Sequence, residues 1–161
     1  MSRPTADSAA IFAFPVPIVI RFSDVDMFGH VNHARYLTFC EDHRTSFFAA
    51  MALSTGSDLF GTGFAVAKLE CEYKAPLTLH SQDVYVSCCV ISLGRSSIRM
   101  RYRIREGERT VALIATVLVV TDPEGRSRSL TGIERDFLGK YVNLSRHSGQ
   151  SRESGRPGDS P

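Results

Sequence analysis

The chain lacks the long apolar runs of membrane proteins and the strong positive charge that is typical of nucleic-acid-binding proteins. No apolar run approaches the roughly 18 or more residues of a membrane span. Lysine is scarce, since Lys68, Lys74 and Lys140 are the only ones among nineteen basic residues, and the formal net charge is +2. So small a charge does not by itself argue for nucleic acid. We therefore expect one domain with no membrane span and no nucleic-acid partner.

Several chemical signatures are also missing. The four cysteines show no C-x-x-C spacing, so neither a zinc site nor a disulfide framework is predicted. The absence of a G-x-S-x-G elbow and of a G-x-x-x-x-G-K loop argues against Ser-His-Asp hydrolysis and NTP chemistry. The first residues contain one Arg and a short apolar stretch broken by Pro15 and Pro17, a poor match to a secretory signal. A cytoplasmic location is therefore expected.

The apolar pattern predicts the order strand, helix, four strands. A first strand is expected from Val16, with Ile18, Ile20 and Phe22 on one face. Asn32 is placed at the N-cap of a long helix over about residues 33–52. One face of that helix carries apolar residues at helical spacing: Leu37, Cys40, Phe47 and Met51.

The four segments after the helix alternate or are apolar throughout, which is typical of an antiparallel sheet. In the first, one face is expected to be buried and the other wet; the buried set is Ala65, Ala67, Leu69, Cys71 and Tyr73. Residues 111–120 are apolar on both faces and predict a central strand. One helix covers five strands only if the sheet curls around it, so an α+β domain is predicted over residues 16–141. Residues 1–15 form an N-terminal extension, and 142–161 are too polar to fold and are expected to be a disordered tail.

Reactive side chains concentrate in SDVDMFGHVNHARY, residues 23–36, at the junction of the first strand and the helix. A helix N-terminus offers unpaired N–H groups that polarise a carbonyl, and Gly29 allows a close turn. Asp24 or Asp26 is available as a carboxylate that is charged at neutral pH. A thioester suits this combination, because its thiolate leaves without a strong general acid.

This stretch, extended to IRFSDVDMFGHVNHARYLTFCEDHR, resembles the signature of the 4-hydroxybenzoyl-CoA thioesterase-like family, which has the hotdog fold. The matching residues are Asp26, Gly29, His30, Val31, Asn32, Tyr36, Glu41 and Arg44. The resemblance implies acyl-coenzyme A hydrolysis with Asp26 as nucleophile or general base. It also implies that the His33 backbone N–H polarises the thioester carbonyl and that Tyr36 lines the acyl pocket. No metal or redox cofactor is implied, and a homodimer or homotetramer with its sites at subunit interfaces is expected.

Other interpretations remain open. Asp24 is expected to cap the turn rather than to react. The spacing of Asp24, Asp26, His30 and His33 is also compatible with a metal site, although the Asn32 cap interrupts it. Arginines at 99, 101, 103 and 105 form a row that faces solvent, coenzyme A phosphates or an acidic carrier protein. An acyl-carrier-protein thioesterase and a non-catalytic acyl-CoA binding protein are the alternative functions.

Overall fold

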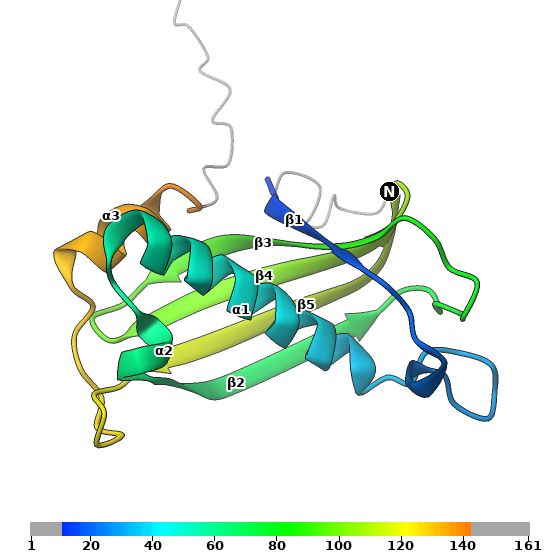
Figure 1. Cartoon of the computed structure of the whole chain (residues 1–161), viewed down its shortest axis with the longest axis horizontal. Helices are drawn as coiled ribbons and strands as arrows, with labels where there is room; N and C mark the ends of the chain where they lie inside the picture. Colours follow the sequence, from blue (N-terminus) through cyan, green and yellow to red (C-terminus); the bar gives the residue numbers. More distant parts are fainter. Residues whose placement is uncertain (1–10, 143–161) are drawn as a thin grey trace, which may run out of the picture.

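Five antiparallel strands form the scaffold of the protein, and one long helix lies across them (Figure 1). The computed structural model describes residues 11–142. The order across the sheet is β1-β3-β4-β5-β2, so β1 and β2 are its two edges. The bounds are β1 (Ala13–Ile18), β2 (Phe64–Tyr73), β3 (Val84–Leu93), β4 (Ser97–Glu106) and β5 (Arg109–Val120). The predicted α+β arrangement is confirmed, whereas the expected tail, apart from its first residue Val142, lies outside the described residues.

Strand β1 lies earlier in the chain than predicted. It begins at Ala13, inside the expected extension, and ends at Ile18, so Phe22 falls in a short 3-10 turn (η1, Phe22–Asp24) and is 83% exposed. Prolines at 15 and 17 obscured the strand, because proline removes a ladder donor. An edge strand tolerates that loss, and β1 accommodates it with a register irregularity between Ala13 and Val16.

Helix α1 (Arg35–Thr55) begins two residues later and ends three residues later than predicted. Asn32 is not its N-cap; the side-chain oxygen of Asn32 accepts the Ala34 N–H at 3.0 Å, which makes a turn before the helix. The helix ends at Gly56, whose φ of +73° is a left-handed conformation that suits glycine. Its buried residues are Tyr36, Phe39, Cys40, His43, Arg44, Phe47, Phe48 and Met51.

The core lies between α1 and the inner faces of the three interior strands. Cys88, Tyr102 and Ile114 occupy one row across β3, β4 and β5, and all are fully buried. No residue of 111–120 is exposed, as expected for an interior strand shielded on both faces. This buried apolar surface holds α1 on the sheet through the hydrophobic effect.

Strand β2 departs from the predicted alternation. Val66 pairs with Leu118 and Lys68 with Val117, so a bulge at Ala67 exchanges the two faces of the strand. Val66 therefore joins Leu69 and Tyr73 on the side that faces α1. These three side chains are 41–46% exposed instead of buried, because β2 is an edge strand that the helix covers incompletely.

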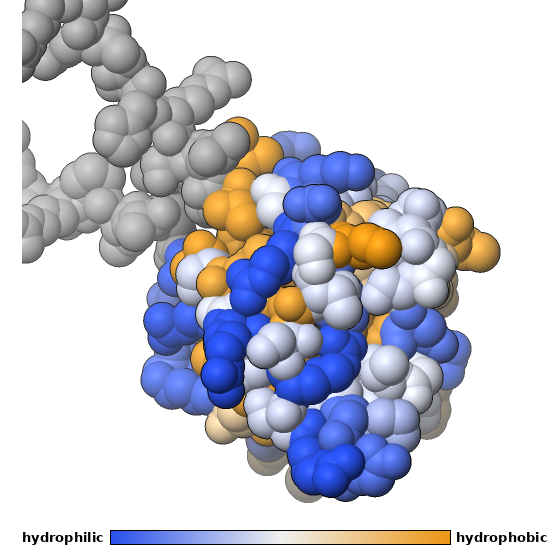
Figure 2. Space-filling model, turned by 90° about the vertical axis from the view of Figure 1, so that its left-hand side faces the viewer, coloured by the Kyte–Doolittle hydropathy of each residue, from blue (hydrophilic) through white to orange (hydrophobic). Residues whose placement is uncertain are grey.

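Two short helices that were not predicted lie at the end of the molecule away from the loop between β1 and α1. They are α2 (Leu59–Thr62) and α3 (Gly132–Gly139). Figure 2 looks onto this end and shows a largely hydrophilic surface with scattered apolar residues. Within residues 11–142, no helix is both long enough and apolar enough to cross a membrane.

Candidate active site

The segment from Val25 to Val31 folds into a tight turn that presents Asp26. The Asp26 N–H donates to the His30 carbonyl at 2.9 Å, and the Gly29 N–H donates to the Asp26 carbonyl at 3.0 Å. Gly29 has φ +77°, and a Cβ there would meet no atom within 4 Å. Glycine is therefore needed for the backbone conformation rather than for lack of space.

The Asp26 carboxylate is only partly engaged. One of its oxygens accepts the Phe28 N–H at 2.9 Å, and the other has no partner among residues 11–142. Asp26 is half-buried, whereas Met27 and Phe28 beside it are 91% and 76% exposed. One oxygen thus orients the side chain, and the other remains available to a water molecule or a substrate.

Asp24 has the capping role that was expected for it. It is 1% exposed, and its carboxylate accepts the Arg35 guanidinium at 2.6 Å and the Arg21 N–H at 2.8 Å. Its backbone carbonyl accepts the Asn32 N–H at 2.8 Å. These contacts join the two ends of the loop that carries Asp26, so Asp24 is a structural residue with no capacity left for substrate.

The turn before α1 leaves one backbone donor unused. Asn32 accepts the Ala34 N–H with its side chain and the Arg35 N–H with its carbonyl. The His33 N–H has no acceptor in the part of the chain that the structure describes, while the His33 carbonyl accepts the Tyr73 hydroxyl at 2.8 Å. An unpaired N–H at the start of a long helix can polarise a carbonyl oxygen.

Tyr36 and a remote segment bound a pocket next to this donor. The Tyr36 hydroxyl accepts the Leu77 N–H at 3.0 Å, and Leu77 in turn accepts the Val31 N–H at 2.8 Å. The Tyr36 and Tyr73 rings meet edge to face, 5.2 Å between centroids. Burial raises the pKa of Tyr36, so its hydroxyl stays neutral at physiological pH.

The pocket has a volume of about 310 Å³ and unites only some of the predicted site residues. Its lining residues are Val31, His33, Tyr36, Tyr73, Lys74, Ala75 and Pro76. Asp26, Gly29, His30 and Asn32 are not among them and lie in the adjoining turn. Residues 73–76 were missed as site residues, because they lie far from residues 23–36 in the sequence and approach that segment only in the folded chain.

Asp24, Asp26, His30 and His33, whose spacing is compatible with a metal site, do not form one in the structure. Within residues 11–142, no three His, Cys, Asp or Glu side chains are arranged to hold an ion. His30 and His33 are both exposed, and Asp24 is already paired with Arg35. The expectation that the reaction needs no metal or redox cofactor stays a prediction.

Comparison with known proteins agrees with this geometry. The sequence matches the thioesterase-like superfamily over residues 20–140. The chain belongs to this superfamily. It is 27% identical over 114 residues to the 1,4-dihydroxy-2-naphthoyl-CoA hydrolase of Synechococcus elongatus, which covers 69% of this chain and 83% of that protein. The predicted thioester hydrolase is thereby confirmed.

Two solved structures similar to this superfamily member support the hotdog fold. A Thermus thermophilus thioesterase complexed with coenzyme A and Zn is 30% identical, with a TM-score of 0.68, and covers 79% of this chain and 98% of that chain. A protein from Pseudomonas aeruginosa strain PAO1 is 25% identical, with a TM-score of 0.73, and covers 84% and 95% respectively. The predicted curved sheet around one long helix is therefore that of a hotdog thioesterase.

Proposed function

We propose that this thioesterase hydrolyses acyl-coenzyme A to the free acid and coenzyme A, with Asp26 as the reacting carboxylate. The observation that carries the proposal is that two adjoining turns before α1 hold an Asp26 oxygen and a His33 N–H, neither of which has a partner within residues 11–142. A carboxylate and an oxyanion donor are the groups that thioester hydrolysis requires.

In the proposed reaction the thioester carbonyl lies against the His33 N–H, which stabilises the negative charge that develops on oxygen. Asp26 either draws a proton from a water molecule that attacks the carbonyl carbon, or attacks that carbon itself to form an anhydride that water then hydrolyses. The thiol of the leaving group has a pKa of roughly 8.5, so the thiolate departs without a dedicated acid. The Tyr36 ring forms a wall of the acyl pocket, and its bond to Leu77 holds it there.

Coenzyme A is favoured as the carrier of the acyl group by the relatives' own ligands. The Synechococcus relative is named for a CoA thioester, and the Thermus structure contains coenzyme A. The arginine row is less suited to an acidic carrier protein, because Glu70 and Glu72 lie on the same outer face. Arg105 and Arg103 on that face already stack over the Tyr85 and Phe12 rings.

A second copy of the chain is proposed to complete the site. Asp26 lies outside the pocket lining, and the apolar side chains of Met27 and Phe28 next to it are exposed. The outer edge of β2, which ends at the pocket residue Tyr73, has no strand partner within residues 11–142. A homodimer that covers these surfaces would bury both, and a tetramer of such dimers is an extension of the same proposal.

The test is thiol release from short, long and aromatic acyl-CoA substrates by the wild type and by Asp26→Asn. We expect Asp26→Asn to lower kcat/KM by roughly 100-fold or more, because it removes the base or nucleophile. Asp136→Asn is the matched control, since Asp136 is exposed on α3 at the other end of the molecule. An unchanged circular-dichroism spectrum shows that the fold is kept.

The outcomes separate the alternatives. Near-normal turnover by Asp26→Asn would contradict the role of this residue. Binding without turnover by the wild type would favour a non-catalytic acyl-CoA binding protein. Hydrolysis of acyl-carrier-protein thioesters but not of acyl-CoA, with a steep dependence on salt, would favour the carrier-protein alternative.

A further inference from the structure

Arg44 is a buried cation without adequate compensation. Its side chain is 6% exposed, and its one ion-pair partner within residues 11–142, Glu41, lies at 3.9 Å and is itself 65% exposed. Within residues 11–142 the guanidinium donates no hydrogen bond; its other neighbour is the Phe64 ring, 5.5 Å from the centroid. Burying a charge costs several kcal/mol unless it is paired and hydrogen-bonded, so this arrangement favours an anion that residues 11–142 do not supply.

Two more polar groups near Arg44 lack good partners. The Thr116 hydroxyl is buried on the inner face of β5 and has no hydrogen-bond partner in the described part of the chain. The buried Tyr102 hydroxyl donates to the Met100 sulfur at 3.5 Å, a weak acceptor, and lies close to the Thr116 hydroxyl. Burial raises the pKa of Tyr102, and the nearby Arg44 charge and Thr116 hydroxyl oppose that rise. Three under-satisfied groups thus gather between α1 and the sheet.

The seam, which is the line along which α1 meets β2, runs from this cluster to the candidate active site. Tyr36, Cys40 and Arg44 are spaced four residues apart on one face of α1, with β2 alongside at the edge of the sheet (Figure 1). Tyr73 contacts Tyr36 at one end of the seam and Phe64 contacts Arg44 at the other. The helix-facing side chains of β2 are partly exposed along its length. Tyr36 and Arg44 are eight residues apart on α1, which corresponds to about 12 Å along the helix axis.

We propose that Arg44, with the hydroxyls of Thr116 and Tyr102, forms the distal end of the acyl-binding site and selects acyl groups that carry a carboxylate at the end remote from the thioester. The proposal rests on the proposed acyl-CoA function. An acyl chain lying along the seam has its thioester at the start of α1 and its terminal carboxylate at Arg44. That carboxylate accepts two guanidinium hydrogen bonds and compensates the buried charge.

The test measures dissociation constants by calorimetry in Asp26→Asn protein, which binds without turnover. The ligands are octanoyl-, decanoyl- and dodecanoyl-CoA, each paired with the ω-carboxyacyl-CoA of equal chain length. We expect the carboxylate form to bind at least tenfold tighter at the length that spans the seam. Adding Arg44→Met should remove or reverse this preference, and Arg44→Lys should keep part of it.

Arg99→Met is the matched control, because Arg99 is exposed on the outer face of the sheet. It should leave the preference unchanged. Equal affinities for the two members of every pair, measured with Arg44 intact, would overturn the proposal. A carboxylate preference that survives Arg44→Met or disappears in Arg99→Met would overturn it as well. Failure of all ligands to bind also overturns it. Wild-type hydrolysis is measured separately, so a carboxylate preference without turnover would refute the proposed function while leaving the Arg44 site standing.

Discussion

Asp24 and Asp26 are two residues apart in the sequence and differ completely in their surroundings. Asp24 is buried and has its carboxylate occupied by Arg35 and by the Arg21 N–H. Asp26 is half-buried and uses one oxygen on its own turn. Their surroundings, rather than the residue type, make Asp24 a structural residue of the loop and leave Asp26 free to be the proposed reactive group. The same distinction applies to Arg35 and Arg44: within residues 11–142, Arg35 has a close carboxylate partner at 2.6 Å, whereas the ion pair of Arg44 is 3.9 Å long.

His43 provides a prediction at the scale of a single residue. It is fully buried, its Nε2 lies 2.8 Å from the Phe14 carbonyl, and its Nδ1 has no partner in the described part of the chain. A carbonyl only accepts, so Nε2 carries the proton and Nδ1 is an unpaired acceptor. Burial lowers the pKa of His43, so the imidazole stays neutral in the folded protein below the ordinary value of 6.5.

As pH falls through about 6.5 the unfolded chain protonates this histidine and the folded protein does not, so the unfolded state binds more protons and stability declines. We expect the wild type to lose about 1 kcal/mol more than His43→Gln between pH 7 and 5.5 in urea unfolding, within the limit of 1.36 kcal/mol per pH unit. His80→Gln, at an exposed site, should keep the wild-type dependence. Parallel pH profiles for the wild type and His43→Gln would contradict this interpretation.

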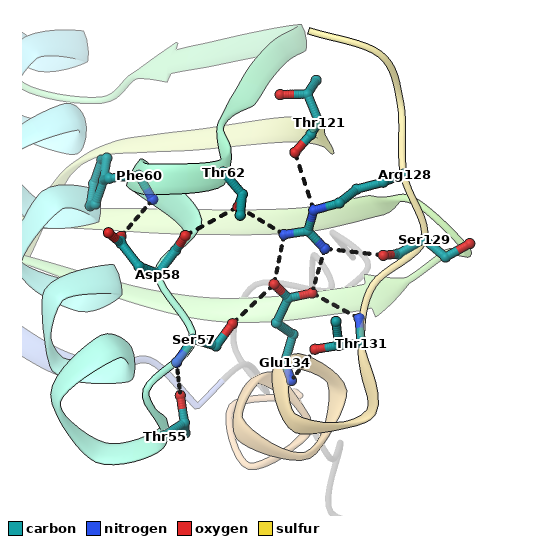
Figure 3. Close-up of polar contacts among 10 residues, drawn as sticks. All are labelled: Thr55, Ser57, Asp58, Phe60, Thr62, Thr121, Arg128, Ser129, Thr131 and Glu134. Atoms are coloured by element: carbon teal, nitrogen blue, oxygen red, sulfur yellow. Dashed lines mark hydrogen bonds and ion pairs between the residues drawn. The ribbon is translucent and has the colours of Figure 1, made fainter. Parts of the chain in front are cut away.

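At the scale of elements, a buried ion pair joins α2, α3 and the end of β5 (Figure 3). Glu134 is 1% exposed and receives two guanidinium hydrogen bonds from Arg128, at 2.7 and 2.9 Å. Glu134 also accepts the Ser57 hydroxyl, and Arg128 donates to Thr62. This clamp of Arg128 and Glu134 therefore adds polar contacts to the apolar ones that Leu59 of α2 and Phe137 and Leu138 of α3 make in the core.

Glu134→Gln should destabilise the protein by roughly 3 kcal/mol, because it leaves the Arg128 guanidinium without its carboxylate. Chemical denaturation measures the change in the free energy of unfolding. Glu124→Gln is the control, since Glu124 forms an exposed pair with Arg126 at 3.2 Å and should contribute less than about 1 kcal/mol. Equal effects of the two substitutions would show that the clamp is no stronger than a surface ion pair.

At the scale of the whole molecule, the proposed homodimer would cover the free edge of β2, whose helix-facing side is partly exposed. Light scattering after gel filtration should give twice the chain mass of 17.8 kDa. Leu69→Glu places a charge on that exposed side of β2 and should shift the protein toward the monomer with loss of turnover. Leu53→Glu, at a site that is 90% exposed on α1, should change neither property. A wild-type monomer with full activity would contradict the proposal, because one chain would then hold the complete site.

Features that depend on patterns of a few neighbouring residues could be predicted from the sequence. Alternation and helical spacing predicted the order of the strands and α1, and the turn with Asp26 and Gly29 was predicted from its own residues. The 3-10 turn at Phe22 and helix α3 were missed. In α3 the signal was present, because Thr131 and Glu134 form a capping box, but a helix of eight residues has too short an apolar pattern to stand out.

The sequence by itself thus determined the superfamily signature, the α+β class and the loop that carries Asp26, because each depends on neighbouring residues. Only the tertiary structure decided the face exchange at Ala67, the second wall of the pocket at Tyr73 and the isolation of Arg44. These features depend on contacts between side chains that are tens of residues apart in the sequence and on which charged groups form an ion pair after folding. Arg44 follows Glu41 by three residues in the sequence, and the packing of α1 against the sheet buries Arg44 and leaves its ion pair with Glu41 at 3.9 Å.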